Sequence, residues 1–187
     1  MVEVRRLDLP GVLEVRPTRH GDERGFFSEV WNRERWREAG IDQDFVQDNH
    51  SLSKERGVLR GLHYQASPMA QAKLVRVTRG KVFDVAVDIR KGSPTFGNWV
   101  SAILSAERWN QLYVPEGFAH GFLTLEPNCE VEYKVSSPYS PEHDRAIRFD
   151  DLDIAIAWPN EAGEIILSDK DRAAPRLAEV QTGFSYP

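Results

Sequence analysis

Four polar side chains fall on strand faces that are otherwise apolar. Side chains alternate across a strand, so residues two apart share a face. On this basis the shared faces are His63 with Gly61 and Gln65, Lys73 with Val75 and Val77, His120 with Phe118 and Phe122, and Tyr133 with Val131 and Val135. Any one of the four polar side chains alone is typical of core packing or of a snorkelling chain. Together, two imidazoles, an ammonium and a phenol that point into one barrel are better explained as a functional site.

This set of groups suits two kinds of chemistry. Imidazoles bind zinc, iron or copper, but Gln65, the next residue on the face of His63, is a weak ligand, so a metal site is not favoured. In metal-free chemistry a histidine is a competent base near neutral pH, a tyrosine is a matching acid, and an ammonium stabilises an oxyanion. These are the groups required to remove and return a proton next to a carbonyl.

A histidine base works better beside a carboxylate that fixes its tautomer and stabilises its protonated form. Asp171 is the candidate for this carboxylate. It has a competing structural interpretation, because Ser168 and Asp171 have the Ser-x-x-Asp spacing of a helix capping box. From these residues alone, the cap is the favoured interpretation.

The elements that would position these groups are mostly short strands. Apolar runs bounded by glycine and proline predict strands at residues 2–7, 12–16, 25–31, 45–49, 58–65, 72–78, 81–89, 99–104, 111–114, 118–125 and 130–135. One helix is predicted at residues 33–39, closed by Gly40, and a second short helix begins at Ser168. Many short strands separated by turn residues are typical of an antiparallel barrel or sandwich.

Length and composition restrict the class of protein. A chain of 187 residues fits a single domain over residues 1–187. The net charge of -5 argues against a nucleic-acid partner, so an anionic ligand requires a local cluster, for which Arg24, Arg60, Lys73 and Lys170 are candidates. We expect no signal peptide and no membrane association. The single cysteine, Cys129, excludes an internal disulfide and fits a reducing cytoplasm.

Two motifs then point to a superfamily. Residues 115–120 read Pro-Glu-Gly-Phe-Ala-His, the Pro-x-Gly-x-x-His of cupins, and residues 61–65 resemble the first cupin motif with its second metal histidine replaced. More specifically, the chain resembles the dTDP-4-dehydrorhamnose 3,5-epimerase family along nearly its whole length. The matching segments lie at residues 22–27, 47–49, 57–65, 72–77, 133–134, 139–143 and 168–171.

This resemblance implies an all-β double-stranded β-helix, a jelly-roll or cupin-like barrel with a few short helices. It further implies a homodimer that works without a metal or an organic cofactor. The implied substrate is a dTDP-4-keto-6-deoxyhexose, dTDP-4-dehydro-6-deoxy-D-glucose. Inversion of its C3 and C5 gives dTDP-4-dehydro-L-rhamnose, in dTDP-rhamnose biosynthesis.

Carried over by position, His63 would be the base, Asp171 its partner, Tyr133 the acid and Lys73 the group that stabilises the enolate oxygen. The resemblance therefore overturns the preference for Asp171 as a cap alone, although one residue could serve both roles. The implied substrate-binding residues, some of them from the partner subunit, are Arg24, Glu29, Gln47, Asp48, Asn49, Arg60, His120, Tyr139, Asp144 and Lys170. Asp144 departs from the family, which usually has the longer glutamate there.

Other functions stay open beside this one. Within the family, the chain could be an epimerase that inverts only one of the two carbons, or a ketoisomerase of another deoxysugar pathway. Outside it, a metal-dependent cupin oxygenase would lose activity on chelation. A non-catalytic sugar-nucleotide binder would fail to turn over any 4-keto sugar nucleotide.

Overall fold

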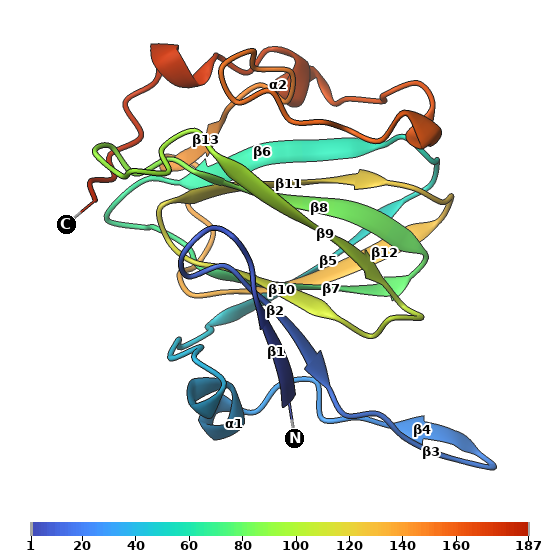
Figure 1. Cartoon of the computed structure of the whole chain (residues 1–187). Coiled ribbons are helices and arrows are strands. Elements are labelled where there is room, and N and C mark those ends of the chain that lie inside the picture. The colour runs from blue at the N-terminus through green and yellow to red at the C-terminus, as the bar shows by residue number, and fades with distance from the viewer. Residues whose placement is uncertain (1, 187) are drawn as a thin grey trace.

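The computed structural model describes residues 2–186 as two antiparallel sheets that face each other, with a small separate hairpin (Figure 1). The six-stranded sheet has the order β1 (Val2–Arg6), β2 (Leu13–Pro17), β10 (Gln111–Val114), β7 (Lys73–Arg79), β12 (Cys129–Val135) and β5 (Gln47–Ser53). The five-stranded sheet has the order β13 (Asp144–Ala146), β6 (Leu59–Gln65), β11 (Phe118–Thr124), β8 (Lys81–Asp88) and β9 (Trp99–Ser105). The hairpin consists of β3 (His20–Asp22) and β4 (Gly25–Phe27).

Four short helices complete the described elements. They are α1 (Arg33–Glu38), α2 (Asp169–Arg172) and the 3-10 helices η1 (Asn160–Ala162) and η2 (Leu177–Glu179). Few sheet neighbours are consecutive in the chain, and the two sheets pack face to face, so the predicted jelly-roll class is confirmed. No helix within residues 2–186 is long and apolar enough to cross a membrane.

The main core lies between the two sheets. Inward-facing residues of both sheets form it, among them Val75 of β7, Leu104 of β9, Phe118 of β11 and Val131 of β12. The alternation predicted for these strands is therefore confirmed, since the outward residues of β8 and β11 belong to a second cluster. The polar side chains of the candidate site replace apolar ones at one part of this core.

Two further layers cover the outer faces of the sheets. The chain after β13 runs over the five-stranded sheet, where Ile154, Ala162 and Leu177 pack against the outward side chains of that sheet (Figure 1). On the opposite side of the molecule, the buried Trp36 of α1 packs with Val15 of β2, an inner strand of the six-stranded sheet. The layer over the five-stranded sheet carries α2, and it thereby supplies one residue of the site.

The predicted strands match the structure closely in the middle of the chain and less well near its start. The strand predicted at 25–31 ends at Phe27, and the strand predicted at 45–49 begins later and runs to Ser53. Sequence reasoning did not predict β3 and β13, which have only three residues each. The helix at 33–39 is confirmed, with Gly40 at φ +96 just beyond it.

Candidate active site

A cavity of about 410 Å³ brings together side chains from both sheets. His63 of β6 and His120 of β11 enter it from the five-stranded sheet, and Lys73 of β7 and Tyr133 of β12 enter it from the six-stranded sheet. The remaining lining residues are Ser51, Val58, Leu59, Arg60, Phe122, Ile166, Leu167, Ser168, Lys170 and Asp171. The four polar residues that alternation assigned to inner faces therefore share one cavity.

Arg60 and His63 both line this cavity although they are three residues apart in one strand. Simple alternation would put them on opposite faces. The register explains the exception: His63 is opposite His120 and Arg60 is opposite Phe122, so three steps along β6 match two along β11. This is the geometry of a β-bulge, which re-aims a side chain.

Glycine makes this close approach of β6 and β11 possible. A Cβ on Gly61 would come within 2.6 Å of the Gly121 Cα, and Gly61 has φ +124. A larger residue at this position would clash with β11 unless one strand moved, and it would also be strained at this backbone angle. The bulge therefore depends on a glycine at this position of β6.

Asp171 performs both of the roles considered for it. Its carboxylate Oδ1 lies 2.5 Å from His63 Nε2, and its backbone N–H donates to the Ser168 hydroxyl, the N-cap of α2, at 3.1 Å. The carboxylate is 4% exposed, against 31% for the imidazole. Burial raises the pKa of Asp171, but the hydrogen bonds from His63 and Ser168 outweigh it and leave the pKa below its usual value. An ionised carboxylate on Nε2 leaves Nδ1 as the nitrogen of His63 that can accept a proton.

Lys73 is a buried ammonium whose Nζ donates to the His63 backbone carbonyl at 3.3 Å. Burial lowers the pKa of Lys73 to about 8, although the nearby Asp144 and Asp84 carboxylates act in the opposite direction. The ammonium is thus charged at neutral pH but close to losing its proton.

Tyr133 faces the same cavity and keeps its proton. Burial raises the pKa of its hydroxyl, and the Arg60 guanidinium reduces this effect only in part. A tyrosine that stays protonated through the neutral range can donate a proton or a hydrogen bond to a bound molecule.

His120 has a carboxylate partner that sequence reasoning missed. Asp84 of β8 is fully buried, and its Oδ1 lies 2.8 Å from His120 Nε2. A signal was available, because Asp84 shares its face of the strand with the apolar Val82 and Ala86, which belong to the main core. The partner could not be identified without knowing that β8 and β11 are adjacent.

Gln65 does not point into the main cavity as a free ligand would. Its amide nitrogen donates to the Met69 and Pro138 carbonyls at 2.7 and 3.1 Å, and its amide oxygen accepts from the Ser140 N–H at 2.8 Å. This buried side chain therefore fixes two loops beside the site. Within residues 2–186, no group of three or more His, Cys, Asp and Glu side chains is arranged to hold a metal ion.

A smaller cavity of about 150 Å³ adjoins the first, since both are lined by His63, Lys73, Tyr133 and Lys170. Five of the remaining predicted binding residues meet here. The Asp144 carboxylate pairs with Lys170 and accepts from the Tyr139 hydroxyl at 3.2 Å. Gln47 accepts from the Tyr139 N–H at 3.0 Å and donates to Asn49 at 2.8 Å.

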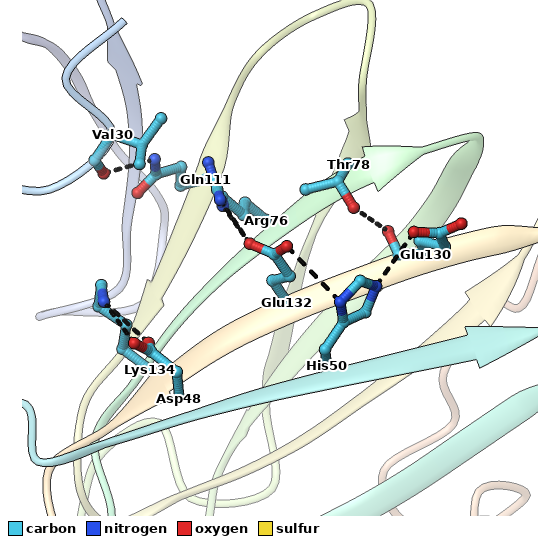
Figure 2. A network of polar contacts seen from close by, with 9 residues as sticks. All are labelled: Val30, Asp48, His50, Arg76, Thr78, Gln111, Glu130, Glu132 and Lys134. Carbon is cyan, nitrogen blue, oxygen red and sulfur yellow. Dashed lines mark hydrogen bonds and ion pairs between the residues drawn. The ribbon is translucent and has the colours of Figure 1, made fainter.

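Three predicted binding residues lie elsewhere in the single chain. Asp48 is on the outer face of the six-stranded sheet, where it pairs with Lys134 beside the Arg76–Glu132 ion pair (Figure 2). Arg24 is at the exposed tip of the β3–β4 hairpin and pairs with Asp22. Glu29 follows that hairpin and pairs with Arg35 at 2.9 Å.

Comparison with known proteins gives a consistent result. A family model described as dTDP-4-dehydrorhamnose 3,5-epimerase matches residues 6–179. A dTDP-4-dehydrorhamnose 3,5-epimerase of Sinorhizobium fredii is 53% identical over 181 residues, which cover 96% of this chain and 92% of the relative.

Two solved structures are also similar. A dTDP-6-deoxy-D-glucose-3,5-epimerase from Legionella pneumophila, in complex with dTDP-4-keto-L-rhamnose, is 45% identical, with a TM-score of 0.95 and 100% of both chains covered. A 3'-monoepimerase from Streptomyces bikiniensis, in complex with dTDP-quinovose, is 40% identical, with a TM-score of 0.86 and coverage of 92% of this chain and 86% of that one.

Proposed function

The chain belongs to the dTDP-4-dehydrorhamnose 3,5-epimerase family of isomerases, and from this premise we propose that it inverts C3 and C5 of dTDP-4-dehydro-6-deoxy-D-glucose. The product would be dTDP-4-dehydro-L-rhamnose. One observation supports this proposal above the others: the Asp171 carboxylate contacts His63 in a cavity that Lys73 and Tyr133 also line. We infer a cytoplasmic setting from the single, buried Cys129.

In the proposed mechanism, His63 removes the proton from the carbon next to the ketone. Asp171 holds the imidazole in the tautomer that accepts this proton and then stabilises the imidazolium. Tyr133 returns a proton to the same carbon from the other side, which inverts it. The origin of His63 and Tyr133 on facing sheets supports this division of roles.

The proton next to a ketone is too weakly acidic for neutral imidazole alone, so the enolate needs stabilisation. The buried Lys73 ammonium is suited to this, because a charge in a low-dielectric cavity interacts more strongly than one in water. Removal of one such electrostatic group typically lowers the rate by about a hundred- to a thousandfold. Arg60 and His120 are proposed to hold the sugar or the nucleotide in the same cavity.

The nucleotide is proposed to extend toward the smaller cavity. Gln47, Asn49, Tyr139, Asp144 and Lys170 line that cavity and offer both a cation and hydrogen-bonding groups. Because Asp144 already binds Lys170 and Tyr139 within the chain, its shorter carboxylate would act on the substrate mainly through these two residues.

A single-carbon epimerase is the second candidate, favoured by the similarity to a 3'-monoepimerase. Product NMR in deuterated water, with dTDP-4-dehydro-6-deoxy-D-glucose as substrate, separates the two. Deuterium and inversion at both C3 and C5 are expected. Inversion at one carbon alone would favour the second candidate, and no turnover would contradict both.

We also propose that the enzyme is a homodimer in which Arg24, Glu29 and Asp48 act on the partner's substrate. Support comes from the β3–β4 hairpin, which extends away from the sheets (Figure 1) and exposes Phe26 and Phe27. Subunit mixing tests this proposal. Arg24→Ala and His63→Asn are each expected to be impaired, and mixed dimers of the two are expected to regain activity through one intact site. Mixtures that show only the average activity of the parents would contradict it.

A further inference from the structure

The hydroxyl of Ser168 forms two hydrogen bonds with the same residue, Asp171. As the N-cap of α2 it accepts from the Asp171 N–H at 3.1 Å, and it donates its own proton to Asp171 Oδ2 at 2.8 Å. The other carboxylate oxygen, Oδ1, lies 2.5 Å from His63 Nε2. Ser168, Asp171 and His63 thus form one chain of hydrogen bonds that ends at the proposed base.

The donated bond is not needed for capping. An N-cap requires only an acceptor for a backbone N–H of the first turn, and glycine is tolerated there nearly as well as serine. The donated proton does something different: it binds Oδ2 while His63 Nε2 binds Oδ1, so both carboxylate oxygens are held and rotation about the side chain would break a bond. It also contributes to holding the pKa of Asp171 below its usual value.

The second imidazole–carboxylate pair of the same cavity provides an internal comparison. Asp84 Oδ1 lies 2.8 Å from His120 Nε2, but its Oδ2 has no hydrogen-bond partner among the described residues. Both carboxylates are buried and both contact an imidazole. Only the pair that contains the proposed base has a hydroxyl on its second oxygen.

From this geometry we propose that Ser168 is a positioning residue of the epimerisation, which acts through Asp171 to orient His63. The proposal rests on the proposed function, because it assigns Ser168 to the base named there. Ser168 holds Oδ1 toward Nε2, and so fixes the ring and leaves Nδ1 free to accept the substrate proton. The effect belongs to the chemical step, so it should appear in kcat more than in KM.

Substitutions at residue 168 separate positioning from capping. Ser168→Gly removes the hydroxyl and keeps most of the cap, Ser168→Ala removes both, and Ser168→Thr keeps both. We expect kcat to fall roughly ten- to a hundredfold in the Gly and Ala variants alike, as for loss of one hydrogen bond to a charged group. Ser168→Thr is expected to retain kcat within about threefold, which is a smaller change than the loss of one such hydrogen bond would cause. The Tm should fall in both the Gly and Ala variants, because both leave Asp171 Oδ2 without its donor, and by about 2–4 °C more in Ser168→Ala, which also loses the cap.

A cap far from the cavity gives the matched control. Asn32 caps α1 by accepting from the Arg35 N–H at 3.1 Å. Asn32→Ala should lower Tm by a similar amount and leave kcat unchanged. The NMR signal of the proton between His63 and Asp171 provides a spectroscopic readout: it should shift in Ser168→Gly and be preserved in Ser168→Thr.

The outcomes distinguish this inference from the function on which it rests. If Ser168→Gly keeps the kcat and the His63 proton signal of the wild type while His63→Asn is inactive, Ser168 is only a cap and the inference is wrong. If kcat follows Tm across the Gly, Ala and Thr variants, the effect is structural and the inference is also wrong. If His63→Asn itself still exchanges substrate protons, the proposed base is wrong, whatever the result at Ser168.

Discussion

Replacing Lys73 by methionine should make the protein more stable at neutral pH while it removes the proposed activity. The ammonium lies in a cavity between two sheets and is 8% exposed. Methionine has a chain of similar length without the charge, so it fills the same space. A residue kept for function at the expense of stability should show this opposite effect of one substitution on the two properties.

The size of the gain follows from the pKa. Burial lowers the pKa of Lys73 from 10.5 to about 8. Each pKa unit corresponds to about 1.4 kcal/mol, so keeping the charge in the folded state costs about 3 kcal/mol below pH 8. Loss of the hydrogen bond from Nζ to the His63 carbonyl removes about 1 kcal/mol of stabilisation. The net expectation is that Lys73→Met is more stable by about 2 kcal/mol at pH 7.

The pH dependence of the free energy of unfolding shows separately that the Lys73 charge destabilises the folded state. Between the folded pKa of about 8 and the unfolded value of 10.5, the folded state binds fewer protons than the unfolded state, so wild-type stability rises with pH in this range. Relative to Lys73→Met, the wild type should therefore regain about 2 kcal/mol between pH 7 and pH 9.5. Urea unfolding of both proteins at both pH values, at one protein concentration, measures this difference.

A surface lysine provides the control. Lys81 pairs with Glu126 at 3.3 Å, and both side chains are more than 40% exposed. Lys81→Met should change the free energy of unfolding by less than about 1 kcal/mol at both pH values. The reasoning is refuted if Lys73→Met is less stable than wild type at pH 7, or if the difference between them is the same at pH 9.5.

The remaining predictions concern pH and the loops at the site. The kcat/KM should fall as pH rises through about 8, because Lys73 then loses the charge that stabilises the enolate; a profile flat to pH 9.5 would contradict this role. Asp84→Asn removes a carboxylate that raises the pKa of Lys73, so this alkaline limb should move to lower pH, and an unmoved limb would exclude the coupling. Gln65→Leu should lower stability by roughly 2–4 kcal/mol, because Ser140 N–H and two carbonyls lose their partner. Since the loop at 138–140 borders the smaller cavity, the same variant should raise KM more than it lowers kcat; an unchanged KM would separate Gln65 from binding.

The parts of the site that depend only on local alternation could be predicted from the sequence. His120 and Tyr133 could be assigned to inner faces because a strand has a period of two residues, whatever lies beside it. The all-β class could be predicted for the same reason. The order of the strands could not, because it depends on contacts between residues far apart in the chain.

Local alternation alone could not place the parts of the site that depend on neighbouring strands. Arg60 joins His63 in the cavity only through the bulge opposite β11, and Asp84 meets His120 only because β8 and β11 are adjacent. The contact of Asp171 with His63 spans 108 positions of the chain. A capping box predicts the position of Asp171 on its helix, but it gives no information about the strand beneath that helix.

Isotope exchange most directly tests the assignment of His63 as base and Tyr133 as acid. The wild type and the variants His63→Asn and Tyr133→Phe would be incubated with the 4-keto sugar nucleotide in deuterated water, with deuterium at C3 and C5 followed by NMR. We predict that His63→Asn folds but loses exchange at both carbons, while Tyr133→Phe loses inversion more than exchange. Undiminished exchange in His63→Asn, or equal loss of exchange and inversion in Tyr133→Phe, would contradict this assignment.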